Sequence, residues 1–285
     1  SATMTEDDSR SPRPLDDLPR SQLGALLAAA PNFRDAGGFM TPAGRRMRPG
    51  VLYRTGQLVD LSPEAETALT SLGISAVYDL RTEGEREPKP DNLPAEIALV
   101  CADVLADAPE SGATAVATLG GKAGNVSISQ VNEMIGGGKA IALMRDTYRD
   151  FVRLPSAHAA YRSVLRGVAG GEGAVAFHCT AGKDRTGWGA AIMQLFAGVD
   201  PTTVMTDYLA SSERTLAQYQ PALEGFERAG GDADALRHLV DVYPEYLETA
   251  IDLMTSTYGD LEGYLVEGVG LSHLDLAALE SRLIA

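Results

Sequence analysis

The segment from His178 to Gly187, with the sequence HCTAGKDRTG, combines a nucleophilic side chain with groups that could bind an anion. A short apolar run at 174–177 precedes it, and apolar residues at helical spacing follow it. A strand, a tight loop and a helix N-terminus in this order direct backbone N–H groups at one point, where the helix dipole adds positive charge. We therefore expect a phosphate-binding loop made of Thr180, Ala181, Gly182, Lys183, Asp184 and Arg185.

Cys179 and Arg185 lie six residues apart and could divide the work of phosphoryl transfer. The electropositive loop would hold Cys179 as a thiolate, since such surroundings lower a free thiol pKa from about 8.5 to roughly 3.5–7.5. A thiolate can attack phosphorus at neutral pH. The planar guanidinium of Arg185 can bind two phosphate oxygens and stabilise their charge during the transfer. The spacing thus predicts a cysteine nucleophile with an arginine as its phosphate-binding cation.

Three further residues of the loop fit this interpretation. Thr186 can donate its hydroxyl to the sulfur, and His178 can orient the loop through backbone hydrogen bonds. Gly182 permits a turn that a Cβ would obstruct. The alternative is a buried cysteine at a strand end with an unrelated arginine on the surface. The preceding apolar run and the trailing Thr-Gly together favour the catalytic interpretation.

Two aspartates are candidates for the general acid that such a reaction needs. Asp79 ends the apolar run ISAVYDL, and strand ends in α/β folds converge on the edge that carries the phosphate loop. Asp184 lies inside the loop itself. We favour Asp79 as the acid. The alternatives are that Asp79 pairs with Arg81 or Arg54, and that Asp184 binds loop amides.

Lys183 adds a second cation to the loop. Together with Arg185 it could meet a substrate that carries more than one phosphate. The alternative is a solvated lysine on the loop surface.

The elements that must position this loop follow an α/β pattern. Ser62-Pro63-Glu64 predicts a helix start, Gly73 predicts its end, and a buried strand is expected over 74–80. Further strands are expected near 51–53 and 97–100. A helix followed by a parallel-type strand indicates an α/β fold, with a central sheet flanked by helices and a helical C-terminal part.

We expect the chain to divide into a mobile N-terminal segment, 1–25, and a single domain, 26–285. Residues 102–138 are rich in Gly, Ala, Ser and Thr, so we expect an insertion or lid there and no core element. The side chains that could rest on the site are apolar: Met134, Ile135, Ile141, Leu143 and Met144.

Composition limits the function classes. The net charge of -15 disfavours nucleic-acid binding, and the absence of an apolar stretch of about 18 residues argues against an integral membrane segment. The N-terminus lacks the pattern of a conventional signal peptide. Two cysteines give no disulfide framework, and Cys101 after an apolar run is expected to be a buried strand thiol. The other histidines have no partners at metal-ligand spacing, so no metal site is expected: His158, His238 and His273.

The loop resembles the signature of the protein-tyrosine-phosphatase superfamily, and AGKDRTG in particular resembles that of the bacterial tyrosine and phosphoinositide phosphatases. The similarity runs from about residue 31 to the C-terminus and is poor over 102–138. The other blocks that carry it are NFRDAGG at 32–38, LYRTG at 52–56, DLR at 79–81, DYL at 207–209 and YGDL at 258–261.

The resemblance implies a protein-tyrosine-phosphatase-like fold and a two-step reaction through a phosphocysteine on Cys179, without a cofactor. It implies phosphotyrosine substrates, with phosphoserine, phosphothreonine or phosphoinositides as further substrates, and transient contact with a membrane surface. A cytoplasmic location, or export without a conventional signal, is expected. Two rival functions are a weakly catalytic phosphate-binding module and a rhodanese-type sulfurtransferase. The continuation to Arg185-Thr186-Gly187 argues against the sulfurtransferase.

Overall fold

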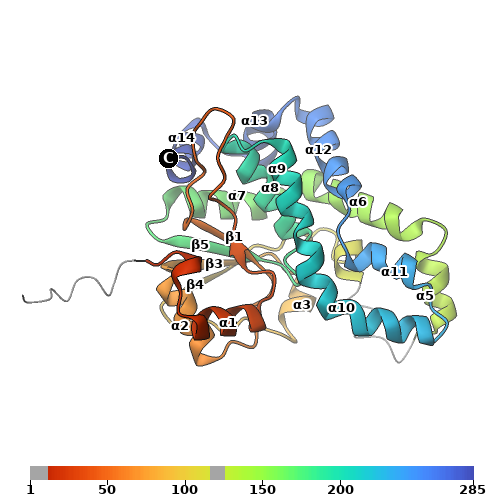
Figure 1. Ribbon diagram of the computed structural model, residues 1–285. Helices are drawn as coiled ribbons and strands as arrows, with labels where there is room; N and C mark the ends of the chain where they lie inside the picture. The colour runs from red at the N-terminus through yellow and green to blue at the C-terminus, as the bar shows by residue number, and fades with distance from the viewer. Residues whose placement is uncertain (1–11, 116–125) are drawn as a thin grey trace, which may run out of the picture.

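A five-stranded sheet with helices on both faces forms the centre of the computed structural model, which describes residues 12–115 and 126–285 (Figure 1). The strand order is β1-β2-β5-β3-β4, with β1 antiparallel to β2 and the other pairs parallel. The predicted α/β fold class is therefore confirmed. The strands are β1 Arg34–Asp35, β2 Leu52–Thr55, β3 Ile74–Asp79, β4 Ala98–Cys101 and β5 Ala174–His178.

Strand β5 is central, and all five of its residues are buried. Its sequence AVAFH carries no exposed polar position, as expected for a parallel strand covered on both faces. His178 at its end is in register with Thr55 of β2 and Asp79 of β3. The carboxyl ends of three strands thus meet at one sheet edge, immediately before the loop that begins at Cys179.

Alternating side chains divide the core between the two faces of the sheet. Tyr53, Val77 and Ala176 pack with the N-terminal helices α1 (Arg20–Ala29) and α2 (Pro63–Ser71). Leu52, Tyr78 and Phe177 belong to the larger core that includes α7 and α8. The remaining helical elements are α3 Glu83–Arg86, α5 Ile128–Ile135, α6 Lys139–Arg153, α7 Pro155–Gly170, α8 Arg185–Phe196, α9 Pro201–Leu209, α10 Ser211–Arg228, α11 Ala233–Val240, α12 Pro244–Tyr258, α13 Leu261–Gly263 and α14 His273–Leu283, with the 3-10 helix η1 Leu15–Asp17 and the π-helix η2 Tyr264–Val269.

Helix α2 forms where the sequence predicts it. The Ser62 hydroxyl accepts a hydrogen bond from the Ala65 N–H at 3.2 Å, and Gly73 ends the helix with a φ of 75°. The C-terminal part is helical, as expected, and helices α8 to α14 follow the loop. Among the described residues, no helix combines the length and apolar character needed to cross a membrane.

The segment 102–138 corrects one prediction, because its described part does contribute to the core. Ala102, Val104 and Leu105 are buried directly after β4, and Val131 and Ile135 of α5 are buried as well. Residues 116–125 lie outside the described residues. The many small residues of this segment therefore led to a wrong prediction, because two parts of it pack in the core.

The apolar residues proposed to rest on the site do not share one environment. Met134 is 58% exposed and Leu143 is 37% exposed, whereas Ile135 and Met144 are buried in the main core and Ile141 is partly buried against it. Helical spacing predicts one shared face, but α5 and the start of α6 point these side chains in different directions.

The prediction that Cys101 is buried is wrong. The thiol is exposed because β4 is the edge strand of the sheet, and three of its four residues are exposed. An apolar run indicates a strand, but it does not reveal whether another strand covers its outer side.

The N-terminal boundary also differs from the prediction over its described part. Residues 12–25 include the turn η1 and the first residues of α1, and Leu18 is buried in the core under α1 and α2. The Arg13 N–H also donates to the Ser71 carbonyl at 2.9 Å. The packed structure therefore starts before residue 26; residues 1–11 of the expected mobile segment lie outside the described residues.

Candidate active site

The predicted loop connects β5 to α8 and is held close to the end of β2. Gly182 has a φ of 73°, and a Cβ at this position would lie 2.4 Å from the Thr55 carbonyl oxygen. The Asn32 side-chain amide and the Arg54 guanidinium each donate to the Gly182 carbonyl at 2.9 Å. The loop carbonyls are thus turned toward these donors, and only glycine fits the left-handed turn beside β2.

The thiol of Cys179 is buried at the start of the loop. Burial alone would raise its pKa, but the positive charge of Arg185 and hydrogen bonds from Thr186 outweigh this effect and lower the pKa. The Thr186 hydroxyl donates to Sγ at 3.2 Å. The surroundings therefore favour the thiolate, the form that acts as a nucleophile.

Arg185 stands in the first turn of α8 and is 1% exposed. Its Nη1 and Nη2 atoms each donate to the carboxylate of Glu85 at 2.7 Å. Its Nε is buried and has no hydrogen-bond partner within the described part of the chain. A buried donor without a partner is costly, so an oxyanion beside Cys179 would satisfy a group that the protein leaves open.

Glu85 is a site residue that sequence reasoning missed. It belongs to the capping box of α3, where its carboxylate accepts from the Thr82 N–H at 2.9 Å. The same carboxylate accepts from the Thr180 hydroxyl at 2.7 Å. Burial raises the pKa of Glu85, but the charge of Arg185 and hydrogen bonds lower it to about 2. The capping pattern Thr82-x-x-Glu85 was visible in the sequence, but its approach to the loop was not.

Lys183 and Asp184 pair with each other and line the same small cavity as Cys179 and Arg185. Lys183 Nζ lies 2.5 Å from Asp184 Oδ2 and donates to the Leu239 carbonyl at 3.0 Å. The Tyr148 hydroxyl donates to Asp184 Oδ1 at 2.7 Å. Both side chains are buried, so neither is a solvated loop residue. In this arrangement they anchor the loop to α6 and α11, and Lys183 would have to leave two partners to meet a second phosphate.

Asp79 forms an ion pair with Arg81, which the sequence analysis gave as the alternative to an acid role. Its Oδ1 and Oδ2 accept from Arg81 Nε and Nη2 at 2.9 Å each. Burial opposes ionisation, but the Arg81 hydrogen bonds and the charges of His178 and Arg81 outweigh burial and lower the pKa of Asp79. The geometry therefore favours a fixed anion at Asp79 over a proton donor.

Asp103 is a second residue that the sequence analysis did not select. It follows β4 and is half-buried, and its Oδ1 accepts from the Leu105 N–H at 3.0 Å. Burial raises its pKa, against the smaller lowering effects of the Leu105 N–H, Arg86 and Arg185. A raised pKa keeps a carboxyl group protonated nearer to neutral pH. The pKa of Asp103 is therefore shifted in the direction that a general acid needs, whereas the pKa of Asp79 is shifted in the opposite direction.

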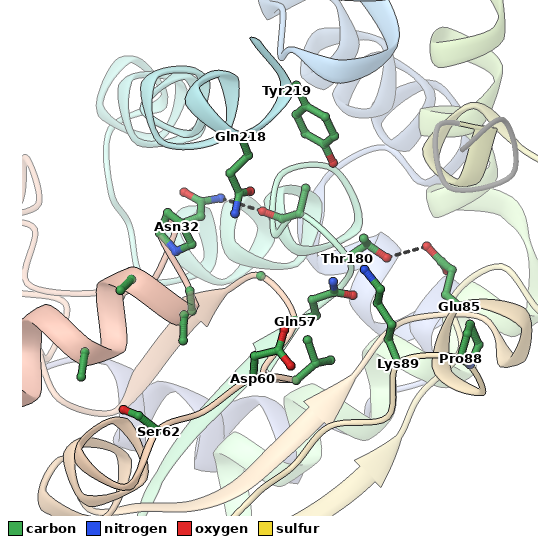
Figure 2. A pocket seen from close by; sticks show the side chains of 18 of the residues that line it. Asn32, Gln57, Asp60, Ser62, Glu85, Pro88, Lys89, Thr180, Gln218 and Tyr219 are labelled. Atoms are coloured by element: carbon green, nitrogen blue, oxygen red, sulfur yellow. Dashed lines mark hydrogen bonds between the residues drawn. The ribbon is translucent and has the colours of Figure 1, made fainter. Parts of the chain in front are cut away.

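Two cavities meet at the loop and share Glu85, Thr180, Ala181 and Tyr219 in their walls. The smaller one, about 30 Å³, is also lined by Cys179 and Arg185. The larger one, about 980 Å³, lies between α1 and α10 and opens beside the loop (Figure 2). A small anion site thus continues into a space large enough for the body of a substrate.

A second group of buried charges joins β1 and β2 to α9 beside the loop. Arg34 Nε and Arg54 Nη1 both contact the carboxylate of Asp207, at 3.1 and 3.4 Å. All three side chains are nearly fully buried. These are therefore buried ion pairs, and Arg54 also reaches the loop, where it donates to the Gly182 carbonyl.

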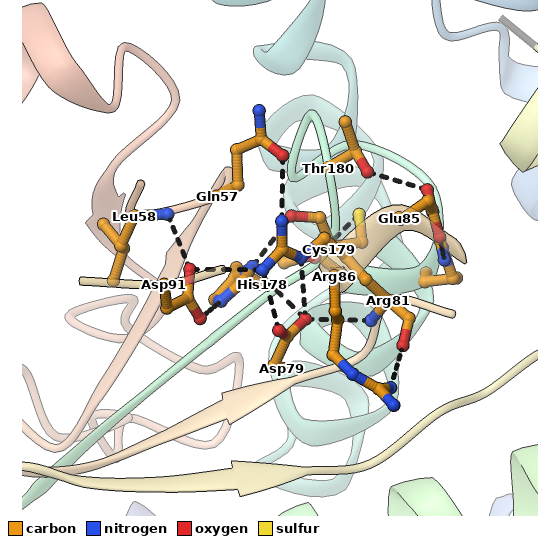
Figure 3. Close-up of polar contacts among 12 residues, drawn as sticks. Gln57, Leu58, Asp79, Arg81, Glu85, Arg86, Asp91, His178, Cys179 and Thr180 are labelled. Carbon is orange, nitrogen blue, oxygen red and sulfur yellow. Dashed lines mark hydrogen bonds and ion pairs between the residues drawn. The ribbon is translucent and has the colours of Figure 1, made fainter. Parts of the chain in front are cut away.

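A third buried network lies under the nucleophile and contains Asp79, Arg81, Asp91 and His178 (Figure 3). Asp79, Asp91 and His178 place potential ligand atoms within 4.8 Å of one another. The guanidinium of Arg81 contacts both carboxylates, at 2.9 and 3.4 Å, and so already supplies the cation of this cluster.

Comparisons of the sequence with a family model and with curated relatives give matches over most of the chain. A model of the tyrosine phosphatase family matches residues 26–285. A Cupriavidus necator protein named "Putative tyrosine-protein phosphatase" is 30% identical over 255 residues, covering 89% of this chain and 86% of the relative. The triple specificity protein phosphatase PtpB of Mycobacterium tuberculosis is 30% identical, covering 84% and 91%. The crystal structure of Pseudomonas aeruginosa TpbA matches with a TM-score of 0.34 and 17% identity, over 76% and 86%.

Replacing Gly182 with alanine is expected to distort the loop, because the new Cβ would meet the Thr55 carbonyl and the left-handed backbone costs a non-glycine residue about 1–2 kcal/mol. The variant should show a lower melting temperature and weaker binding of inorganic phosphate in calorimetry. Gly225→Ala on α10 is the control, since nothing lies within 4 Å of its Cβ position. Equal phosphate affinity in Gly182→Ala and wild type would contradict the close fit.

Replacing Thr186 with valine should raise the pKa of the Cys179 thiol by roughly one to two units, since a hydrogen bond to a charged group contributes about 1.5–3 kcal/mol. The measurement is the pH dependence of alkylation by iodoacetamide in a Cys101→Ser background. Thr215→Val removes a buried hydroxyl that donates to the Ser211 carbonyl at 2.7 Å and serves as control. An unchanged alkylation profile in Thr186→Val would show that the hydroxyl does not stabilise the thiolate.

Proposed function

Because the chain belongs to the tyrosine phosphatase family, we propose that it hydrolyses phosphotyrosine in proteins through a phosphocysteine on Cys179. One observation carries the proposal: a thiol of lowered pKa and the unpartnered Nε of Arg185 belong to residues that line one small cavity. A phosphate held there by loop N–H groups and Nε would bring its phosphorus to the sulfur. The phenyl ring of the substrate would extend into the larger cavity, where Tyr219 supplies an aromatic wall.

In the first step Cys179 Sγ attacks phosphorus, the S–P bond forms and the bond to the leaving oxygen breaks. Arg185 and the loop amides stabilise the charge on the equatorial oxygens. A protonated carboxyl group donates its proton to the leaving oxygen, so that tyrosine departs as the neutral phenol. In the second step water attacks the phosphocysteine, gives its proton to the same carboxylate and releases inorganic phosphate and the thiolate.

We assign the acid role to Asp103 in preference to Asp79 and Asp184. Asp79 is held as an anion by Arg81, and Asp184 has both oxygens engaged by Tyr148 and Lys183. Asp103 has a raised pKa and interacts electrostatically with Glu85 and Arg185 of the site. A raised pKa favours the protonated carboxyl group, the form that can donate a proton to a leaving oxygen.

Asp103 of the segment 102–138 interacts electrostatically with Glu85 and Arg185, and Ala113 of the same segment lines the small cavity. These two observations support the proposal that the segment acts as a cover for the loop. A cover would limit access of oxidants to a thiolate of lowered pKa.

The substrate range is a further part of the proposal. One relative is named a triple specificity phosphatase, and the large cavity, about 980 Å³, has room for more than a phenyl ring. We therefore extend the proposed substrates to phosphoserine, phosphothreonine and phosphoinositides, with transient contact at a membrane surface for the lipids. The proposed location is cytoplasmic, or outside the cell after export without a conventional signal.

Wild-type protein should release inorganic phosphate from a phosphotyrosine peptide, and Cys179→Ser should release none above background. Cys101→Ser is the control, because this exposed thiol on β4 lies outside the proposed machinery. Phosphoserine peptides and vesicles with mono- or bisphosphorylated inositol lipids complete the panel. No release by the wild type from any substrate would support the phosphate-binding module instead, and equal release by Cys179→Ser would remove the cysteine from the mechanism.

Asp103→Asn should lose roughly 100-fold or more in kcat on phenyl phosphate, a substrate with a poor leaving group, since general acid catalysis contributes about 10²–10⁴-fold. The loss should be smaller on p-nitrophenyl phosphate, whose leaving group needs less protonation. Wild-type kcat should fall as the pH rises through the raised pKa of Asp103, and the variant should lack this basic limb.

Asp107→Asn is the control for Asp103, because it removes an exposed carboxylate from the same segment. Asp79→Asn should lower the melting temperature and retain the basic limb. A basic limb that survives in Asp103→Asn and disappears in Asp79→Asn would reverse the assignment.

A further inference from the structure

Asp91 is a fully buried carboxylate that the proposed reaction does not use. It lies between α3 and β4, and its side chain is 0% exposed. Oδ1 accepts from the Leu58 N–H at 3.0 Å and lies 3.4 Å from Arg81 Nη2. Oδ2 lies 2.5 Å from His178 Nε2 (Figure 3). A buried charge with such complete pairing is costly to assemble, so its position beside the nucleophile invites a functional explanation.

The two ring nitrogens of His178 both face acceptors. Nε2 faces the Asp91 carboxylate, and Nδ1 lies 2.8 Å from the Cys179 carbonyl oxygen. A carbonyl oxygen cannot donate, so Nδ1 must carry a proton. Oδ1 of Asp91 already faces two donors, the Leu58 N–H and Arg81, so Asp91 offers Oδ2 as an acceptor and Nε2 donates to it. These contacts fit a doubly protonated imidazolium.

The charges of the groups around His178 are consistent with an imidazolium. Asp79 Oδ1 lies 3.9 Å from Nδ1, and Arg81 bridges Asp79 and Asp91. Two carboxylates thus face one guanidinium and one imidazolium. Burial lowers the pKa of His178, but the hydrogen bond and charge of Asp91, followed by the charge of Asp79, outweigh burial and the repulsion from Arg81, so the pKa is raised.

From this geometry we propose that Asp91 is a positioning residue for the nucleophile. It keeps His178 doubly protonated, so that the Nδ1–H fixes the Cys179 carbonyl and a positive charge stays next to the thiolate residue. The inference rests on the proposed role of Cys179 as nucleophile. Asp91 itself touches neither the sulfur nor the small cavity.

The same network reaches the wall of the larger cavity. Arg81 Nη1 donates to Gln57 Oε1 at 3.1 Å and to the Lys89 carbonyl at 2.7 Å, and both residues line that cavity. Asp91 itself is bound to the N–H of Leu58, the residue after Gln57. A change at Asp91 is therefore expected to act mainly on the thiolate and kcat, with a smaller effect on KM through this wall.

The direct test is the protonation state of His178, read from the 15N chemical shifts of its ring nitrogens in wild type between pH 5 and pH 8. Both nitrogens should give the imidazolium signature across neutral pH. A neutral ring at pH 7 in the wild type would overturn the proposal without any substitution.

The second test compares Asp91→Asn with wild type. The amide oxygen of the variant can still accept from the Leu58 N–H, but the neutral side chain cannot hold a proton on Nε2 by charge. The ring should become neutral at pH 7, and the thiol pKa should rise by roughly one unit, so alkylation by iodoacetamide below that pKa slows about tenfold. The acidic limb of kcat/KM should move to higher pH by the same amount.

Asp35→Asn is the matched control. Asp35 is also largely buried, and it accepts from the backbone N–H groups of Gly37 and Gly50 at 2.8 and 2.7 Å, away from the loop. This substitution should lower the melting temperature without moving the thiol pKa. Equal shifts of the thiol pKa in Asp35→Asn and Asp91→Asn would show that the effect is general destabilisation and would overturn the proposal.

A double-substitution cycle separates action through His178 from a direct effect. His178→Asn alone should raise the thiol pKa, and adding Asp91→Asn should raise it no further. Additive shifts would contradict the proposed route. The ring shifts and alkylation rates need no phosphatase activity, so a wild type that releases no phosphate would refute the proposed function and leave this test intact.

Discussion

The contact between Arg185 and Glu85 shows the constraint that organises the rest of the site. A loop built to receive an anion concentrates positive charge in a buried place, and burial of an unpaired charge is strongly unfavourable. Glu85 meets this requirement by binding both Nη atoms, while Nε is left for a ligand. The carboxylate also accepts from Thr180, so it holds the guanidinium and the loop in one geometry. Such preorganisation lowers the cost of arranging dipoles around a transition state.

Two further clusters of buried charges near the same loop are also held as ion pairs. Asp79 and Asp91 with Arg81 lie under the nucleophile, and Asp207 with Arg34 and Arg54 lies behind Gly182. The pairs of Arg34 and Arg54 with Asp207 join segments more than a hundred residues apart in the chain. Their contribution to net stability is expected to be modest, because desolvation offsets most of the attraction. Their main effect is to restrict the loop to one arrangement.

The sequence predicted contacts within one local unit, and it failed where a contact depends on how distant segments pack in the fold. Cys179, Arg185 and Thr186 lie on one strand–loop–helix unit, so their spacing was enough to predict their proximity. Asp79 ends one strand and Asp103 follows another, and only the fold shows that Arg81 pairs with Asp79 and that Asp103 interacts with the charges of the site. Cys101 was misplaced because strand order, and hence the edge position of β4, is not encoded in a run of apolar residues.

Charge balance explains why the loop can accept a thiolate and a phosphate together. Arg34 and Arg54 share the single carboxylate of Asp207 within the described network, which leaves an excess of positive charge behind Gly182. Burial and the neighbouring Arg54 lower the pKa of Arg34 to about 9, despite the opposing effect of Asp207, as expected where cations outnumber anions. An anion in front of the loop would relieve this excess, because charges interact more strongly in a buried region than in water. The paired clusters therefore hold the loop in place, and the unpaired remainder attracts the substrate.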